Sequence, residues 1–219
     1  LMHIRALQVF THDSIGLGED GPTHQAVAHL WALRLIPGYY VWRPGNGVET
    51  AMAWAYAVGE GPDAPHALVF SRQKPPAYAL PEGFDPKEVW KGAYEVRGAD
   101  NAQVTLIGTG TEAGLAAAAG EELAKHGVHA RVVSMPCVER CLEQDEATRQ
   151  AILPKGLPVV TVEAGSTLPW ASICNGAPGL HLGVDSFGES APAEEVYDHF
   201  GLTPEKIAGR VKTWLEGLS

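Results

Sequence analysis

The regular alternation of short apolar runs with amphipathic, helix-like segments most restricts what this chain can fold into. From Val104 to Leu218 a strand-like run is followed by a helix-like segment again and again. This order is typical of α/β layers in which helices cover mostly parallel strands. We therefore predict an α/β protein with mostly parallel sheets.

The second half of the chain is expected to form a complete five-stranded domain over residues 99–219. Its apolar runs predict strands at 104–107, 129–134, 159–162 and 180–184. Its helices are expected at 111–126, 145–152, 169–174, 193–200 and 204–218. Thr203 and Pro204 have the residue types of an N-cap and a first helical position, which fixes the start of the last helix.

The first 72 residues carry fewer elements. Strands are expected at 4–10, 39–42 and 66–70, and helices at 25–34 and from a capping-box-like pair, Asn46 and Glu49, to about Val58. Parallel sheets are normally covered on both faces, yet nothing precedes the first strand that could cover it. We expect residues 1–72 to be an incomplete domain, in a chain that is the C-terminal part of a longer protein.

A proline-rich segment separates these halves. Residues 73–91, QKPPAYALPEGFDPKEVWK, contain four prolines and no clean period. Such a segment is typical of a linker that runs over the surface. We assign residues 73–98 to this linker.

Charge and cysteine content exclude some classes of protein. The chain has 16 basic and 26 acidic residues, a net charge of −10, which disfavours a general nucleic-acid or anionic-membrane binder. Three cysteines, Cys137, Cys141 and Cys174, match no usual zinc spacing. We expect reduced thiols in a cytoplasmic protein.

The loop after the first strand holds the densest set of functional groups. It leaves the carboxyl end of a strand, where ligands bind in α/β sheets. From the residues alone it could be a metal site, an acid–base site for a polyol, or a capped surface loop. It contains His12, Asp13, Ser14, Glu19, Asp20 and His24.

The sequence of this loop, THDSIGLGEDGPTHQ, closely resembles the signature of transketolases. The segments VWRP, SRQ, VVSMP, VEAG and FGESAPAEE follow in the order of that family. The resemblance implies transfer of a two-carbon ketol unit from a ketose phosphate to an aldose phosphate, with thiamine diphosphate and Mg²⁺ or Ca²⁺ as cofactors. It also implies a cytoplasmic homodimer of the pentose phosphate pathway, with active sites between subunits.

Four residues of this chain match the family's substrate-binding positions. The resemblance implies that His12 and Asp20 bind the sugar phosphate and its hydroxyls, and that His24 binds substrate and acts in catalysis. Arg72 of SRQ would bind the substrate phosphate, for which a guanidinium is well shaped. Because His24 precedes the expected helix at 25–34, we expect the helix dipole to favour its neutral imidazole.

The resemblance places the cofactor-binding residues upstream of Leu1 and assigns no metal ligand to this chain, which we expect to be inactive alone. The chain departs from the family after SRQ, where Lys74, Pro75 and Pro76 follow. The glycine loop GTGTEAG at 108–114 is interpreted as a tight turn with Thr111 as N-cap, and a regulatory anion site is the alternative.

Other functions stay open on the sequence alone. Another thiamine-diphosphate enzyme, such as a deoxyxylulose-phosphate synthase or the β-subunit of a 2-oxoacid dehydrogenase, shares this architecture. The synthases, however, are expected to lack the histidine present here as His12. A non-catalytic module that binds sugar phosphates or a partner chain is the alternative from a different class.

Overall fold

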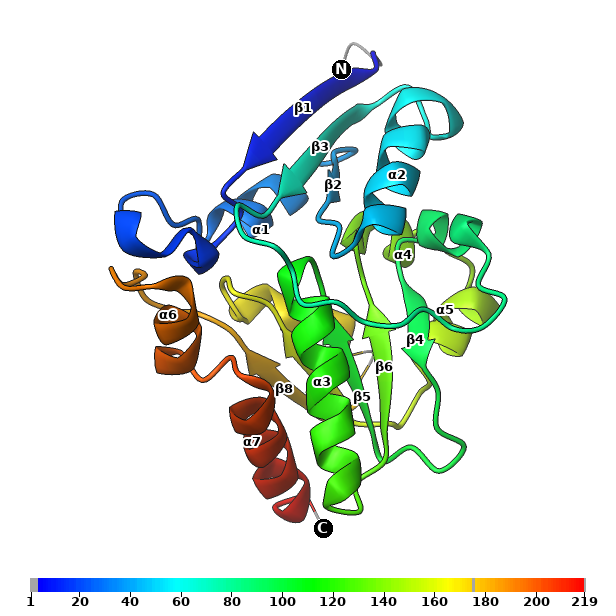
Figure 1. Cartoon of the computed structure of the whole chain (residues 1–219). Coiled ribbons are helices and arrows are strands. Elements are labelled where there is room, and N and C mark those ends of the chain that lie inside the picture. Colours follow the sequence, from blue (N-terminus) through cyan, green and yellow to red (C-terminus); the bar gives the residue numbers. More distant parts are fainter. Residues whose placement is uncertain (1–3, 175, 219) are drawn as a thin grey trace.

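The computed structural model describes residues 4–174 and 176–218 and shows two α/β units, one around each of two sheets. The first unit lies above the second in Figure 1, and an extended segment runs between them after β3. This arrangement confirms the predicted α/β class with mostly parallel sheets.

The first unit is built on a three-stranded parallel sheet with strand order β1-β3-β2. Its strands are β1 (Ala6–Thr11), β2 (Tyr40–Trp42) and β3 (Pro65–Phe70). The central strand is β3, whose run from His66 to Val69 is buried, as its apolar composition predicts. β1 is an edge strand, and most of its side chains are exposed.

Short helices surround this sheet. They are the 3₁₀ segment η1 (Ile15–Asp20), α1 (His29–Arg34), α2 (Gly47–Ala55) and the π-helical turn η2 (Tyr56–Glu60). As predicted, Asn46 caps α2, because its Oδ1 accepts a hydrogen bond from the Glu49 amide at 2.9 Å. The Glu49 carboxylate, however, is fully buried and accepts from the Gly45 amide rather than completing the capping box.

The helix predicted at 25–34 is shorter than expected. α1 begins at His29, after an N-cap at Ala28 that has no side-chain hydrogen bond. The carbonyl of Val27, which would accept within a longer helix, accepts instead from the Ser166 amide of the second unit at 3.1 Å. A long-range contact therefore replaces the first helical turn.

The second unit contains a five-stranded sheet in the order β4-β6-β5-β7-β8. β4 pairs antiparallel with β6, and the other pairs are parallel. The strands are β4 (Tyr94–Arg97), β5 (Val104–Gly108), β6 (Ala130–Ser134), β7 (Val159–Val162) and β8 (Gly179–Leu182).

The sheet has five strands, as predicted, but only four of them coincide with predicted runs, and the prediction that residues 73–98 are entirely linker is wrong. This range contains the 3₁₀ helix η3 (Pro86–Lys91) and β4. The four-residue strand YEVR is too short to show a clear alternation, and antiparallel pairing to β6 creates it. We therefore propose that the second unit begins before Tyr94, whereas the other domain boundaries stay predictions.

Helices cover both faces of this sheet. The helices of this unit are α3 (Thr111–Lys125), α4 (Val138–Leu142), α5 (Glu146–Ile152), η4 (Leu168–Ile173), α6 (Ala193–His199) and α7 (Pro204–Glu216), and of these α6 packs against η1 of the first unit. Thr203 caps α7 through the Lys206 amide, as predicted. No helix within the described residues is long and apolar enough to cross a membrane.

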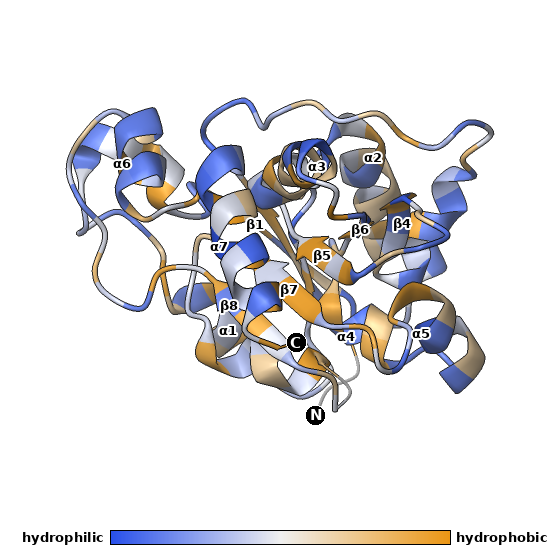
Figure 2. Cartoon of the chain, turned by 90° about the horizontal axis from the view of Figure 1, so that it is seen from below, coloured by the Kyte–Doolittle hydropathy of each residue, from blue (hydrophilic) through white to orange (hydrophobic). Residues whose placement is uncertain are grey.

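The side chains of the five-stranded sheet divide between two core layers. Leu106 and Val132 pack in one cluster, which continues into the first unit, whereas Ile107 and Val133 pack in another. This division follows from the two-residue period of a strand, which points neighbours to opposite faces. Figure 2 shows apolar strands such as β5 and β7 inside the molecule and hydrophilic residues on α3, α6 and α7 around them.

The three cysteines are free and buried, in agreement with the prediction of unpaired thiols. Burial is the largest cause that raises the pKa of Cys137 and Cys141, the latter to about 11. Neither is therefore a thiolate near neutral pH.

Candidate active site

The carboxyl ends of β1 and β3 bring two of the predicted substrate-binding residues to one edge of the first sheet. The strands are parallel neighbours, and Thr11 pairs with Phe70 in register. His12 and Ser71 therefore leave the sheet side by side, and Arg72 follows Ser71. The loop and the SRQ segment also touch, because the Gln73 amide lies directly against Gly16, where a Cβ would be 2.0 Å from its Nε2.

His12 has a backbone conformation that side chains rarely adopt. Its φ is 68°, the only positive value for a non-glycine residue in the described part of the chain. A left-handed residue of this kind costs about 1–2 kcal/mol and is kept where the surrounding structure imposes it. The next residue, Asp13, is buried and held by ion pairing, which explains how the turn is imposed.

The middle of the loop is pinned by one side chain from within and by a segment of the second unit. The Gln25 amide nitrogen donates to the carbonyls of Gly18 and Glu189 at 3.0 and 2.9 Å, and the Ile15 carbonyl lies 3.3 Å from it. Ser190 Oγ donates to the Glu19 carbonyl at 2.6 Å. Asp20 is exposed just beyond these contacts, so its backbone is held while its carboxylate is free to reach a ligand.

A turn at Gly21 returns the chain toward the site and exposes His24. The His24 amide donates to the Gly21 carbonyl at 3.0 Å, and Gly21 has a φ of 78° that favours glycine. His24 Nδ1 lies 2.9 Å from Thr23 Oγ1, whereas its Nε2 has no partner among the described residues. His24 borders a cavity of about 690 Å³ that is also lined by Asp185, Ser186 and Phe187.

The expectation that a helix dipole favours the neutral imidazole of His24 is not supported by the structure. α1 starts five residues after His24 and has only six residues, so the histidine is not at a helix N-terminus. The effect of a helix dipole falls off within the first turn. What the structure offers instead is a fixed ring orientation, because Thr23 occupies Nδ1 and leaves Nε2 available.

Arg72 is exposed, but both of its neighbours are anchored to the second unit. Ser71 Oγ lies 2.8 Å from Thr111 Oγ1, and Gln73 Nε2 donates to the same hydroxyl at 3.4 Å. The prediction that Thr111 caps α3 is wrong, because Gly110 is the N-cap and Thr111 is the first helical residue. The Thr111 hydroxyl points across the interface between the units instead.

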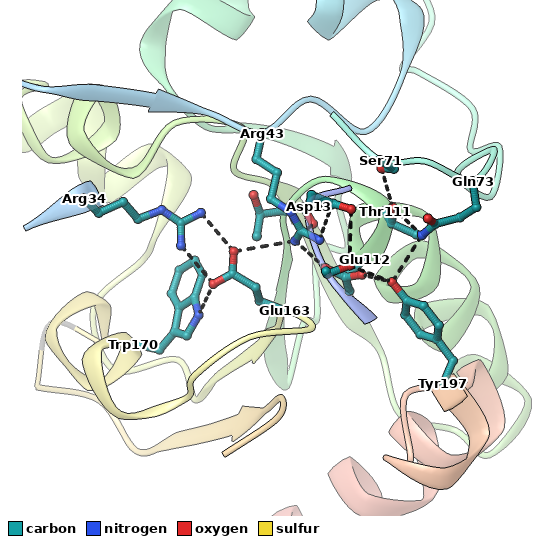
Figure 3. A network of polar contacts seen from close by, with 12 residues as sticks. Asp13, Arg34, Arg43, Ser71, Gln73, Thr111, Glu112, Glu163, Trp170 and Tyr197 are labelled. Atoms are coloured by element: carbon teal, nitrogen blue, oxygen red, sulfur yellow. Dashed lines mark hydrogen bonds and ion pairs between the residues drawn. The ribbon is translucent and has the colours of Figure 1, made fainter. Parts of the chain in front are cut away.

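Behind the loop lies a buried ionic network that sequence reasoning did not identify (Figure 3). Its centre is Arg43, which is fully buried and donates to Asp13 Oδ2 from Nε at 2.9 Å and from Nη2 at 2.6 Å. Arg43 Nη1 donates to the Thr109 carbonyl at 2.9 Å and to Glu112, and lies 3.5 Å from Glu163 Oε1. This one guanidinium therefore joins the two units.

A second arginine completes the network. Arg34 forms a two-pronged ion pair with Glu163 at 2.8 and 2.9 Å, and Trp170 Nε1 donates to the same carboxylate at 2.9 Å. The Arg34 guanidinium also lies 4.8 Å from the centre of the Trp31 ring. Burial opposes the charge of Glu163, but Arg34 and Arg43 together leave its pKa below the ordinary value.

The network has one more carboxylate than it has guanidinium groups. Burial is the largest cause that raises the pKa of Glu112, with Arg43 acting in the opposite direction. Tyr197 donates to Glu112 Oε1 at 2.7 Å and supplies a neutral donor where a third cation is lacking. Three carboxylates, those of Asp13, Glu112 and Glu163, face the two guanidinium groups of Arg34 and Arg43.

The network also explains the glycine loop at 108–114. Gly110 has a φ of 58°, and a Cβ there would lie 2.8 Å from the Arg43 side chain. The loop therefore turns tightly so that its backbone can approach Arg43, which agrees with the interpretation as a turn. A charged residue directly after a buried strand, as in VWRP and VEAG, was the sequence signal for this network.

Comparisons with known proteins agree with this architecture. Residues 1–77 match the model of the transketolase pyrimidine binding domain, and residues 92–203 match that of the transketolase-like TK C-terminal domain. The chain is 50% identical to the plasmid transketolase of Cupriavidus necator over 99% of its own length and 32% of that protein.

Solved structures give the same result. The chain superposes on the transketolase of Leishmania mexicana with a TM-score of 0.89 and 40% identity, covering 98% of this chain and 31% of that one. Against the Pichia stipitis transketolase solved with sedoheptulose 7-phosphate, the TM-score is 0.86 and the identity 37%, covering 94% and 29%.

Fold and loop together define an α/β protein that joins a pyrimidine-binding unit to a transketolase-type C-terminal unit. The chain belongs to the transketolase family. It spans about a third of the length of the relatives it matches.

Proposed function

We propose that this chain supplies a substrate-binding part of a transketolase, which transfers a two-carbon ketol unit between sugar phosphates. The observation that carries the proposal is the shared sheet edge from which His12 and the SRQ segment emerge. Sedoheptulose 7-phosphate, named with the Pichia stipitis structure, is a ligand of this chemical class.

The proposed roles follow from the chemistry of the exposed side chains at that edge. Arg72 offers a guanidinium that stays charged at working pH and suits a phosphate. His12 offers a hydrogen bond to the sugar phosphate and Asp20 accepts one from a sugar hydroxyl, and His24 offers a free Nε2 for binding and proton transfer. Thiamine diphosphate, when bound, would serve as the electron sink for the transferred unit.

The described residues do not fit the metal that accompanies this cofactor. No group of three or more His, Cys, Asp or Glu side chains that could hold an ion occurs among them. We propose that residues outside this chain hold Mg²⁺ or Ca²⁺ and the cofactor diphosphate. We also propose a cytoplasmic homodimer that acts in the pentose phosphate pathway, because the family resemblance implies each of these.

The chain alone is expected to bind thiamine diphosphate weakly, because its described residues offer no site for the metal. Calorimetric titration of the 219-residue chain with thiamine diphosphate and Mg²⁺ measures this. A binding isotherm at micromolar concentration or below would show that the chain holds the cofactor by itself.

Replacement of Arg72 by Ala in the full-length enzyme is expected to raise KM for phosphorylated sugars selectively. A hydrogen bond to a charged group contributes about 1.5–3 kcal/mol, which corresponds to roughly 10- to 100-fold. Steady-state kinetics with erythrose 4-phosphate and with erythrose as acceptors measures the difference. Equal changes in KM for the two acceptors would remove the phosphate-binding role from Arg72.

Mixing the chain with the missing part of the enzyme tests the overall proposal. Turnover of xylulose 5-phosphate with ribose 5-phosphate in the reconstituted sample would support it. Binding of sugar phosphates without turnover would favour the alternative of a non-catalytic module.

A further inference from the structure

The two segments that carry the proposed substrate-binding residues are fastened to neighbouring side chains of the second unit, and they share Tyr197. Ser71 and Gln73, on either side of Arg72, bond to Thr111. In the loop, Asp13 directly follows His12. Arg43 donates hydrogen bonds to both Asp13 and Glu112 and so links the loop to the second unit. Tyr197 completes the set (Figure 3).

The Tyr197 hydroxyl connects the two segments to each other. It donates to Glu112 Oε1 at 2.7 Å, which uses its single hydrogen. Its oxygen then accepts from Gln73 Nε2 at 3.5 Å, and Ser14 Oγ lies at the same distance from it. Ser14 belongs to the loop of His12 and Gln73 to the segment of Arg72, so one phenol oxygen spans both.

The three side chains of the second unit are buried, whereas the proposed substrate-binding residues are exposed. Thr111, Glu112 and Tyr197 are 3%, 0% and 8% exposed, whereas His12 and Arg72 are exposed to solvent. Hydrogen bonds shielded from water restrain geometry more strongly than exposed ones. Thr111 and Tyr197 are therefore placed to act on a substrate at the sheet edge through the segments they fix.

We propose that Thr111, Glu112 and Tyr197 are positioning residues through which the C-terminal unit sets the relative placement of His12 and Arg72, and thereby the affinity for phosphorylated sugars. This inference rests on the proposed function. It gives the C-terminal unit a part in substrate selection, although none of its residues is placed at the reacting atoms.

The test uses the full-length enzyme with Thr111→Val, which removes the hydroxyl and keeps the shape. KM for erythrose 4-phosphate is expected to rise about five-fold, the factor that corresponds to ~1 kcal/mol for a neutral hydrogen bond. KM for erythrose is expected to stay unchanged, because that acceptor does not need Arg72. Thr111→Ser, which restores a hydroxyl, is expected to return KM close to the unmodified value.

Tyr197→Phe provides a second variant if Thr111→Val folds poorly, and the same selective rise in KM is expected. The matched control is Thr105→Val, the same change at a buried threonine of β5 whose hydroxyl has no partner among the described residues. The control is expected to leave both KM values unchanged.

Arg72→Ala in the same assay separates the two proposals. If Arg72→Ala discriminates between the acceptors but Thr111→Val and Tyr197→Phe do not, the positioning role is wrong and the proposed function stands. Equal rises for both acceptors would likewise overturn the positioning role, because general loosening would explain them. If Arg72→Ala itself shows no preference, the proposed function of that residue fails.

Discussion

Replacement of His24 by Ala in the full-length enzyme is expected to lower kcat by roughly 10²- to 10⁴-fold, the usual contribution of a general acid–base group. The structure supports this role through orientation. Thr23 holds Nδ1 at 2.9 Å, so Nε2 is left for substrate, and the ring borders the cavity at 22–29. Steady-state kinetics with xylulose 5-phosphate as donor measures the effect.

The pattern of the kinetic constants separates catalysis from anchoring. A residue that binds the ground state and the transition state equally raises KM and leaves kcat unchanged. Stopped-flow detection of the donor-derived species adds an independent measure of the chemical step. An unchanged kcat with a raised donor KM would reduce His24 to a binding residue.

Thr23→Val tests whether the orientation of the His24 ring matters, because it leaves the imidazole in place and removes only the contact at Nδ1. If ring orientation matters, this variant should lose a small part of the activity that His24→Ala loses. A neutral hydrogen bond contributes about 1 kcal/mol, so a roughly five-fold lower kcat is expected. The same kcat as the unmodified enzyme would mean that the contact at Nδ1 does not orient the ring.

Much of the fold could be predicted because apolar runs in parallel sheets are continuous. β3, β5 and β7 are buried on both faces and were located within one residue of their observed ends. The start of α1 could not be predicted, because it depends on the bond between Val27 and Ser166. β4 could not be predicted because YEVR, unlike the equally short β7, has two charged residues and no apolar run, and it becomes a strand by pairing with β6.

The candidate site was predictable in part. A loop after a strand is where ligands bind, and the pairing of Thr11 with Phe70 explains why His12 and Arg72 leave one edge. The position of Arg43 and Glu163 directly after buried strands is a signal in the sequence, but the pairing within the network could not be predicted, since no spacing relates Asp13, Arg43 and Glu112. Each is an ordinary charged residue in sequence, and only tertiary packing makes them partners.

The network has a testable consequence for stability. Arg43→Met is expected to lower the free energy of unfolding by about 3–5 kcal/mol, the usual cost of removing one partner from a buried ion pair. The cost arises because Asp13 and Glu112 would stay buried without their shared cation. Urea unfolding of the 219-residue chain, followed by tryptophan fluorescence, measures it.

An exposed ion pair serves as the control. Arg149 pairs with Glu146 at 2.8 Å, and both side chains are about half exposed, at 39% and 54%. Arg149→Met should therefore cost no more than about 1 kcal/mol.

Arg43→Lys keeps the charge but loses the planar fork that reaches Asp13, Thr109 and Glu112 together. We expect its stability to lie between those of the unmodified chain and Arg43→Met, which keeps the prediction testable if the methionine variant does not fold. If Arg43→Met were no less stable than Arg149→Met, the carboxylates around Arg43 would have to be protonated or hydrated rather than held by its charge. The ion pairs of Arg43 would then contribute little to the joining of the two units.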